Sequence, residues 1–122
     1  MNVLILGATS AIAAEVAALH AARGHRLHLV GRNADKLAAL AARCPGATVQ
    51  RADFGDLGGD AAVIAQAIAA LDGRIDVALV AHGELGDQLE SERSFVEAER
   101  ILRVNFLSVV ALLVPLANHL ET

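Results

Sequence analysis

Near the start of the sequence, a glycine turn that could bind phosphate interrupts an apolar run. Val3–Leu6 is continuously apolar, Gly7 follows it, and apolar residues resume at helical spacing from Ile12. Glycine permits a sharp turn, and the N-terminus of a helix offers unpaired backbone N–H groups and a positive dipole that attract a pyrophosphate. Thr9 and Ser10 could add hydroxyl donors. We therefore predict a strand, a phosphate-binding turn and a helix, with plain packing as the alternative.

A second segment with possible chemistry, Gly31-Arg32-Asn33, follows the next apolar run. At the end of the second strand of a dinucleotide fold, a carboxylate binds the adenosine 2′-hydroxyl and an arginine binds a 2′-phosphate. The segment has no acid, and the Arg32 guanidinium could pair with a phosphate and stack on adenine. Arg32 therefore favours NADP(H) over NAD(H), the alternative being a solvated loop arginine. No Gly-Lys pair is followed by Ser or Thr, so a mononucleotide P-loop is excluded.

The elements that would position these residues alternate along the chain. Apolar runs predict strands at residues 3–6, 27–30, 47–51 and 77–80, with helical patterns between them that end at Gly24, Pro45-Gly46 and Gly73. Short turns between alternating strands and helices require right-handed crossovers. We therefore predict an α/β fold, a Rossmann-type doubly wound parallel sheet with strand order 3-2-1-4. Its ligand crevice would lie outside the carboxyl ends of strands 1 and 4.

The apolar spacing also predicts which faces of these elements are buried. The first helix would bury Ile12, Val16 and Leu19, and the second, capped by Asn33, would bury Leu37, Leu40 and Ala41. The third would bury Ile64, Ile68 and Leu71. Polar residues alternate with Val49 in the third strand, which indicates an edge strand.

After a polar loop over residues 83–90, the pattern predicts a long helix over residues 91–119. Its segment 106–117 is apolar nearly all the way round, and one sheet face covers only part of such a helix. We expect a partner subunit or another part of the same protein to cover the rest. A membrane span is disfavoured because the run is shorter than the roughly 20 residues that a bilayer requires and contains Pro115.

Composition excludes several classes of function. A chain of 122 residues fits one domain, and a net charge of -4 with Lys36 as the one lysine disfavours nucleic acid. The single Cys44 fits a reducing compartment, and no basic leader precedes the first apolar run, so we expect a cytoplasmic protein. His25 and His28 have no further ligand at metal-binding spacing, and we interpret them as a surface and a strand histidine.

These motifs together resemble the N-terminal half of the short-chain dehydrogenases/reductases. The segment 6–13, Leu-Gly-Ala-Thr-Ser-Ala-Ile-Ala, is similar to that family's Thr-Gly-x-x-x-Gly-x-Gly turn, and Arg32 matches its NADP-selecting arginine. Ala52-Asp53-Phe54 resembles the motif whose aspartate meets the adenine. Ala81-His82-Gly83 stands where the family has Asn-Ala-Gly, and Val104-Asn105 matches the helix asparagine that supports the catalytic water network. The resemblance covers the whole chain in order and spacing.

The resemblance implies a set of site residues, some with alternative interpretations. Cofactor binding would fall to Gly7, Thr9, Ser10, Ala11, Ile12, Arg32, Asn33, Asp53, Phe54, Ala81, His82 and Gly83. Asn105 would support catalysis, although a lone polar residue on an apolar helix is often a satisfied buried group. Asp53 could equally form a turn without a ligand. We interpret Asp76, ahead of the last strand, as structural.

Four positions depart from the family pattern. Ala11 and Ala13 replace two glycines of the turn, and their methyl groups would crowd the backbone's approach to a pyrophosphate. Ala81 replaces an asparagine that would brace the strand ends. His82 either contacts cofactor or substrate, or is a loop histidine with no specific task.

The family reaction transfers hydride between nicotinamide and a small carbonyl or alcohol, with a tyrosine, a lysine and a serine handling the proton and the substrate. This sequence has no tyrosine, and its one lysine, Lys36, falls on the adenosine side. We therefore expect residues 1–122 to be one NAD(P)-binding subdomain, part of a longer reductase that dimerises through the 91–119 helix. A non-catalytic NADP(H)-binding or sensing module is the alternative.

Overall fold

The strands form a parallel sheet in the order β3-β2-β1-β4, as predicted. The computed structural model describes residues 1–54, 59–83 and 88–121. The strands are β1 (Asn2–Leu6), β2 (Arg26–Gly31), β3 (Thr48–Arg51) and β4 (Val77–Val80). In the register, Ile5 of β1 lies opposite Leu29 of β2 and Leu79 of β4, and Leu29 lies opposite Val49 of β3.

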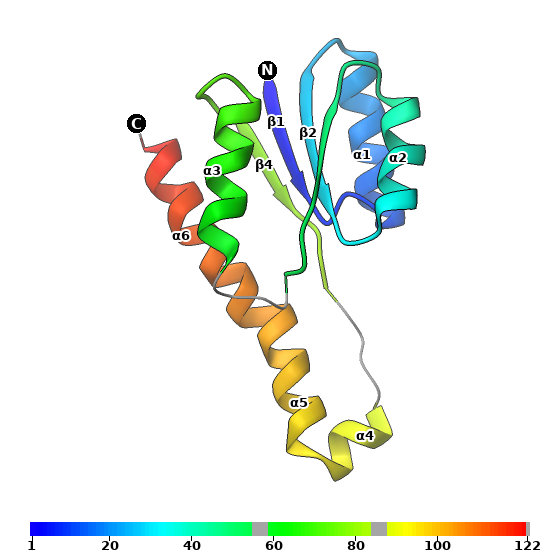
Figure 1. Cartoon of the computed structure of the whole chain (residues 1–122), viewed down its shortest axis with the longest axis vertical. Helices are drawn as coiled ribbons and strands as arrows, with labels where there is room; N and C mark the ends of the chain where they lie inside the picture. Colours follow the sequence, from blue (N-terminus) through cyan, green and yellow to red (C-terminus); the bar gives the residue numbers. More distant parts are fainter. Residues whose placement is uncertain (55–58, 84–87, 122) are drawn as a thin grey trace.

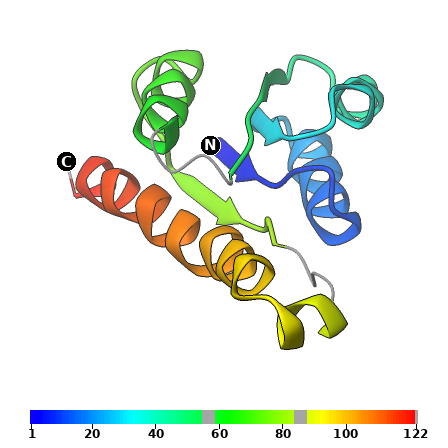
Figure 2. The same cartoon turned by 60° about the horizontal axis from the view of Figure 1, so that its bottom comes forward.

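Helices cover both faces of the sheet. Helices α1 (Ala11–Ala22) and α2 (Ala34–Arg43) lie on one face, and α3 (Asp60–Ala70) and α6 (Ser108–Leu120) lie on the other (Figures 1 and 2). In β1, Val3 and Ile5 pack with α1 and α2, whereas Leu4 and Leu6 pack with α3 and α6. Because each face has its own helices, successive residues of β1 are buried, which explains the continuous apolar run.

The predicted buried face of α1 is wrong for Ile12 and Leu19, whereas Val16 is partly buried against the core as expected. The residues buried in α1 are Ala13 and Ala17, whereas Ile12 is 78% exposed and Leu19 is 63% exposed. Methyl side chains let the helix approach β1 and β2 closely, and the larger side chains turn outward. In a helix that is apolar nearly all round, the largest residues do not mark the face that packs.

The second helix follows its predicted pattern. The Asn33 side chain accepts a hydrogen bond from the backbone N–H of Lys36 at 3.1 Å, which caps the first turn of α2. Leu37 and Leu40 are buried as expected, and Ala41 is partly buried.

Strand β3 lies at one edge of the sheet and satisfies a buried histidine of β2. The His28 ring is 3% exposed, with Nδ1 2.7 Å from the Thr48 hydroxyl and Nε2 2.9 Å from the Gln50 amide oxygen. Because the amide oxygen only accepts, Nε2 donates to Gln50 and the Thr48 hydroxyl donates to Nδ1. Burial lowers the pKa of His28. The polar residues of β3 thus partner His28, which confirms that it is a strand histidine.

The predicted 91–119 helix is divided. A short α4 (Gln88–Arg93) ends before Ser94, whose extended backbone (φ −135°, ψ 122°) precedes α5 (Phe95–Leu102). A π-helical turn, η2 (Arg103–Leu107), then connects α5 with α6. The expected loop therefore ends at Gln88, and its residues 84–87 lie outside the described parts of the chain.

Helix α6 packs through one stripe. Leu112 and Leu116 are buried against α3, whereas large apolar residues on its other sides are exposed: Val110, Leu113, Val114 and Leu120. The helical run from Phe95 to Leu120 has 26 residues and a mean hydropathy of 1.8, enough to cross a membrane by length and composition alone. Its length is therefore no argument against a span, and the packing of Leu112 and Leu116 is what assigns α6 to the sheet layer.

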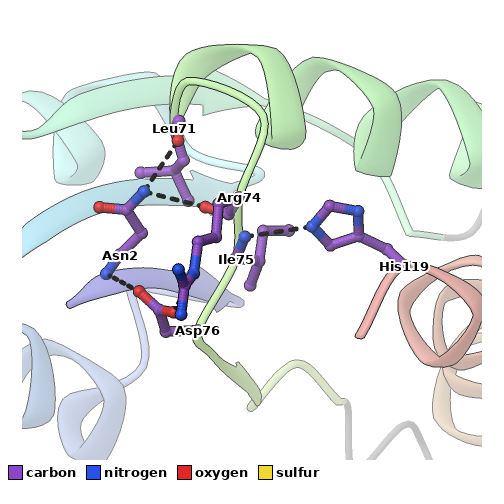
Figure 3. A network of polar contacts seen from close by, with 6 residues as sticks. All are labelled: Asn2, Leu71, Arg74, Ile75, Asp76 and His119. Atoms are coloured by element: carbon purple, nitrogen blue, oxygen red, sulfur yellow. Dashed lines mark hydrogen bonds and ion pairs between the residues drawn. The ribbon is translucent and has the colours of Figure 1, made fainter. Parts of the chain in front are cut away.

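Polar contacts close the amino end of the sheet (Figure 3). The Asn2 side chain donates to the carbonyl oxygens of Leu71 and Arg74 at 2.8 and 3.0 Å, and the Asn2 backbone N–H donates to the Asp76 carboxylate at 2.8 Å. His119 Nε2 accepts from the backbone N–H of Ile75 at 3.1 Å, which joins the end of α6 to the same loop. Asp76 is structural, as predicted, and the Asn2 N–H and the Arg74 guanidinium hold its pKa below the usual value.

Candidate functional site

A cavity of about 490 Å³ lies at the carboxyl ends of the strands, beside α5. The arrowheads of the strands point toward this end of the molecule in Figure 1. The cavity brings together most of the predicted cofactor residues: Gly7, Thr9, Ser10, Arg32, Asp53, Phe54, Ala81, His82 and Gly83. Its volume falls within the range of about 300–1,000 Å³ that is typical of small-molecule sites. The predicted crevice is thus present at the expected edge of the sheet.

Gly7 is required by the chain that leaves β4. Its φ of +80° is left-handed, and a Cβ at this position would lie 2.4 Å from the backbone nitrogen of His82. The N–H groups of Gly7 and Ala8 both donate to the carbonyl oxygen of Val30, at 2.8 and 3.0 Å. Gly7 therefore lines the cavity, but its N–H is already used within the protein.

The first turn of α1 provides the donors for an anion. The Ser10 hydroxyl oxygen accepts from the backbone N–H of Ala13 at 3.3 Å, so its own proton can be donated to a ligand. Ala11 and Ile12 do not line the cavity, although their N–H groups belong to the helix N-terminus. Ala13 is fully buried in the core with Ala17. Its methyl group fills the contact between helix and strand, away from the cavity.

Arg32 and Lys36 place two cations on the wall beside β2. Both residues line the cavity, Arg32 from the loop after β2 and Lys36 from the first turn of α2. The Arg51 Nε donates to the backbone carbonyl of Arg32 at 3.0 Å, which fixes this part of the loop. Asn33 does not line the cavity, because its side chain caps α2. The pair of cations could bind a phosphate group.

His82 has defined contacts within the site. Its ring stacks on Phe54 with centroids 4.2 Å apart and an interplanar angle of 20°. Its Nε2 lies 2.7 Å from the hydroxyl oxygen of Ser108, the first residue of α6. Burial lowers the pKa of His82, so the ring is neutral near pH 7. His82 therefore has a stacking partner and a hydrogen-bond partner within the protein, and it lines the cavity.

Asn105 lies at the rim of the cavity. It is the central residue of η2, and its Oδ1 lies 3.3 Å from the position that a Cβ on Gly83 would occupy. It is not part of the cavity lining, whereas Gly83 and Val104 beside it are. The structure thus brings Asn105 to the edge of the predicted site.

Sequence reasoning missed four lining residues: Lys36, Arg100, Arg103 and Val104. Arg100 pairs with Glu97 at 2.8 Å and Arg103 pairs with Glu99 at 2.5 Å along the helix. Arg100, Arg103 and Val104 recur at helical spacing, which places them on one face. That spacing could have been recognised in the sequence, but the sequence alone did not show which face of this helical run lies beside the cavity.

Comparison with known proteins identifies the family. Residues 1–122 match the family described as short chain dehydrogenase. This protein belongs to the short-chain dehydrogenases. Uncharacterized oxidoreductases from two strains of Mycobacterium tuberculosis, CDC 1551 and H37Rv, are each 36% identical to it over 125 residues. The match covers 98% of this chain and 49% of each relative, so the chain spans about half the length of the curated relatives it matches.

Solved structures agree with this assignment. A levodione reductase is 25% identical, with a TM-score of 0.87 over 96% of this chain and 48% of its own. A short-chain dehydrogenase/reductase from Serratia marcescens, at 21% identity and a TM-score of 0.87 over 97% of this chain and 50% of its own, shares the fold. Short-chain dehydrogenases bind a nicotinamide cofactor, NAD or NADP, and act on small molecules. The Rossmann-type fold predicted from the sequence is confirmed.

Proposed function

We propose that this chain forms the NADP(H)-binding part of an oxidoreductase that transfers hydride between nicotinamide and a small carbonyl or alcohol. The observation that carries the proposal is that the Ser10 turn, Arg32 and Lys36 all line the same cavity. A dinucleotide with a 2′-phosphate has anionic groups at two places, the pyrophosphate and the ribose. The helix N-terminus suits the first, and the two cations beside β2 suit the second.

The residues present fit such a cofactor. Thr9, Ser10 and the first N–H groups of α1 would hold the pyrophosphate, and Arg32 with Lys36 would hold the 2′-phosphate. Asp53 would meet the adenosine, from its place on the same wall. The bound cofactor would supply the hydride chemistry. Within this chain, Asn105 is the proposed supporting residue at the reacting end.

We propose none of these residues as the donor of the proton that accompanies hydride transfer, because the sequence contains no tyrosine. A module that binds or senses NADP(H) without turnover is therefore the second candidate. An activity assay on the protein expressed from its whole gene distinguishes the two functions, because only the reductase would turn over a substrate. Oxidation of NADPH with a panel of small aldehydes and ketones supports the reductase, whereas binding without oxidation supports the module.

Calorimetric titration tests the cofactor assignment. We expect the chain to bind NADPH at least tenfold more tightly than NADH, and Arg32→Ala to remove most of that preference. Arg43→Ala is the matched control, because Arg43 is also an arginine of the α2 region, pairs with Glu15 and does not line the cavity. Equal affinities of the unmutated chain for NADPH and NADH would overturn the role of Arg32.

We also propose that a second copy of the protein covers the exposed apolar face of α6. Val110, Leu113 and Val114 are all exposed and lie on neighbouring turns of one helix. Sedimentation equilibrium should give a dimer for the unmutated protein and a monomer for Leu113→Lys. A monomeric unmutated protein would exclude this interface.

A further inference from the structure

The π-helical turn η2 has an unusual set of hydrogen bonds around Ser108. The backbone N–H of Ser108 donates to the carbonyl of Arg103, five residues earlier, rather than to Val104. The Val104 carbonyl therefore loses the partner that an α-helix would give it. The hydroxyl of Ser108 replaces that partner, since it donates to the Val104 carbonyl oxygen at 2.6 Å. Ser108 thus bonds to two successive carbonyl groups of the turn, one through its backbone and one through its side chain.

His82 fixes the direction of the Ser108 hydroxyl. Because the hydroxyl proton is directed at Val104, the Ser108 oxygen accepts from His82, and His82 Nε2, 2.7 Å away, must carry a proton. Burial favours the neutral ring, so the proton on Nε2 leaves Nδ1 bare. Ser108 is fully buried.

The hydrogen bond from His82 to Ser108 leaves the other ring nitrogen of His82 in an unfavourable environment. Its Nδ1 is buried and has no hydrogen-bond partner in the described parts of the chain. An unpaired buried nitrogen is unfavourable, and a phenylalanine would stack on Phe54 without that cost. Simple packing therefore does not explain a histidine here, whereas the single donor to Ser108 does.

We propose that His82 is a positioning residue. Through Ser108 and the Val104 carbonyl it holds η2 in its π-helical form, and η2 holds the Asn105 side chain beside Gly83 at the rim of the cavity. The chain after β4 and the turn before α6 are thereby locked together, with no ligand required. The inference rests on the proposed function only where it gives Asn105 a role at the reacting end.

The tautomer of the unmutated protein is the first test. Long-range ¹H–¹⁵N NMR spectra of the 122-residue chain at pH 7.5 should show His82 as the neutral form protonated at Nε2. Protonation at Nδ1, or rapid exchange between the two tautomers, would overturn the proposal. This measurement needs no variant and no cofactor, so it stands or falls separately from NADP(H) binding.

Two substitutions separate the donor from the ring. His82→Gln keeps an N–H donor, whereas His82→Phe keeps the stacking surface on Phe54 and removes the donor. We expect the amide of Ser108 to exchange with solvent at least tenfold faster in His82→Phe, and the Asn105 side-chain amide signals to move. In His82→Gln both should stay close to those of the unmutated protein. Equal behaviour of the two variants would show that His82 acts by packing alone.

Ser108→Ala provides an independent check and His25→Ala the control. Ser108→Ala removes the hydroxyl that joins His82 to the Val104 carbonyl, and it should accelerate amide exchange in η2 as strongly as His82→Phe. This check does not depend on whether His82→Phe folds well. His25 lies just before β2, at the opposite end of the sheet, and its replacement should leave η2 and the Asn105 signals unchanged. Unchanged exchange in Ser108→Ala would contradict the proposal.

Discussion

At the amino end of the sheet, hydrogen bonds join the polar groups that line a cavity of about 540 Å³, whereas polar groups from separate elements line the cavity at the carboxyl end. Asn2, Asp76 and His119 bond to backbone or side-chain partners of the α3–β4 loop. At the other end, Ser10 and Lys36 line open space, and His82 keeps one buried nitrogen without a partner. The difference shows which end is built for stability. Polar side chains that bond to the α3–β4 loop lie at the amino end, and the side chains that we propose for cofactor binding lie at the carboxyl end.

The largest expected effect on stability comes from replacing a glycine, and each end of the sheet has one to compare. Gly7 and Gly24 both have a left-handed φ, of +80° and +76°, but a Cβ on Gly24 would meet nothing within 4 Å. Gly24→Ala should therefore lose about 1 kcal/mol of unfolding free energy from the backbone alone. Gly7→Ala adds a clash with the backbone of His82 and should lose about 3 kcal/mol or more.

Urea denaturation followed by circular dichroism measures both losses. Similar losses for the two glycine variants would mean that the chain after β4 can move away from Gly7 at little cost.

Asn2→Ala should weaken the hydrogen-bond network at the amino end without affecting the carboxyl end. The substitution removes two hydrogen bonds to the carbonyl groups of Leu71 and Arg74, which should cost about 1–2 kcal/mol of unfolding free energy. The affinity for NADPH should change less than twofold. Asn118→Ala, an exposed position in α6, serves as the control and should be neutral in both measurements. A loss of NADPH affinity in Asn2→Ala alone would show that the two ends are coupled.

Mild acid should destabilise the protein through its buried and partly buried histidines. The pKa values of His28 and His82 are lowered from 6.5 by burial, and that of His25 is lowered as well. Above pH 6.5 these rings are neutral in both the folded and the unfolded state. As the pH falls below 6.5, the unfolded chain binds protons before the folded protein does. The free energy of unfolding therefore decreases with falling pH, until the pH is below the pKa values of the folded protein. The contribution of Asp76 is lost only near or below pH 3.8.

Urea midpoints measured between pH 8 and pH 5 test this. His82→Phe should show a shallower decline than the unmutated protein. A stability that is constant from pH 8 to pH 5 would contradict the burial of both rings.

The smallest expected effect concerns the loop that carries Arg32. Arg51→Ala removes the bond from Arg51 Nε to the Arg32 carbonyl, so Arg32 would be held less firmly. We expect a loss of NADPH affinity of about two- to fivefold, equivalent to roughly 0.5–1 kcal/mol. Arg23→Ala, at an exposed position after α1, controls for the lost charge. An unchanged affinity in Arg51→Ala would mean that the loop holds its shape unaided.

The sequence predicted the sheet better than it predicted the helices. Continuous apolar runs reveal strands covered on both faces, and alternation with helices then determines the order 3-2-1-4. In α1 the same reasoning failed, because alanine packs closely and leaves Ile12 exposed. The same difference between strands and helices holds for the residues of the candidate site. Its strand-end residues were predicted, whereas Arg100 of α5 and Arg103 of η2 were missed because the sequence does not show which face of this helical run lies beside the cavity.

The π turn also determines the rotational phase of everything that follows it. It contains one residue more than an α-helical path would need, and each residue turns a helix by about 100°. Without that extra residue, α6 would be rotated by this angle about its axis, and Leu112 and Leu116 would leave the contact with α3. The turn therefore lets two independent demands be met along one helix, a polar side chain aimed at the rim and an apolar stripe aimed at the sheet. A single-residue deletion between positions 103 and 107 should therefore abolish either the position of Asn105 at the rim or the packing of α6 on the sheet layer.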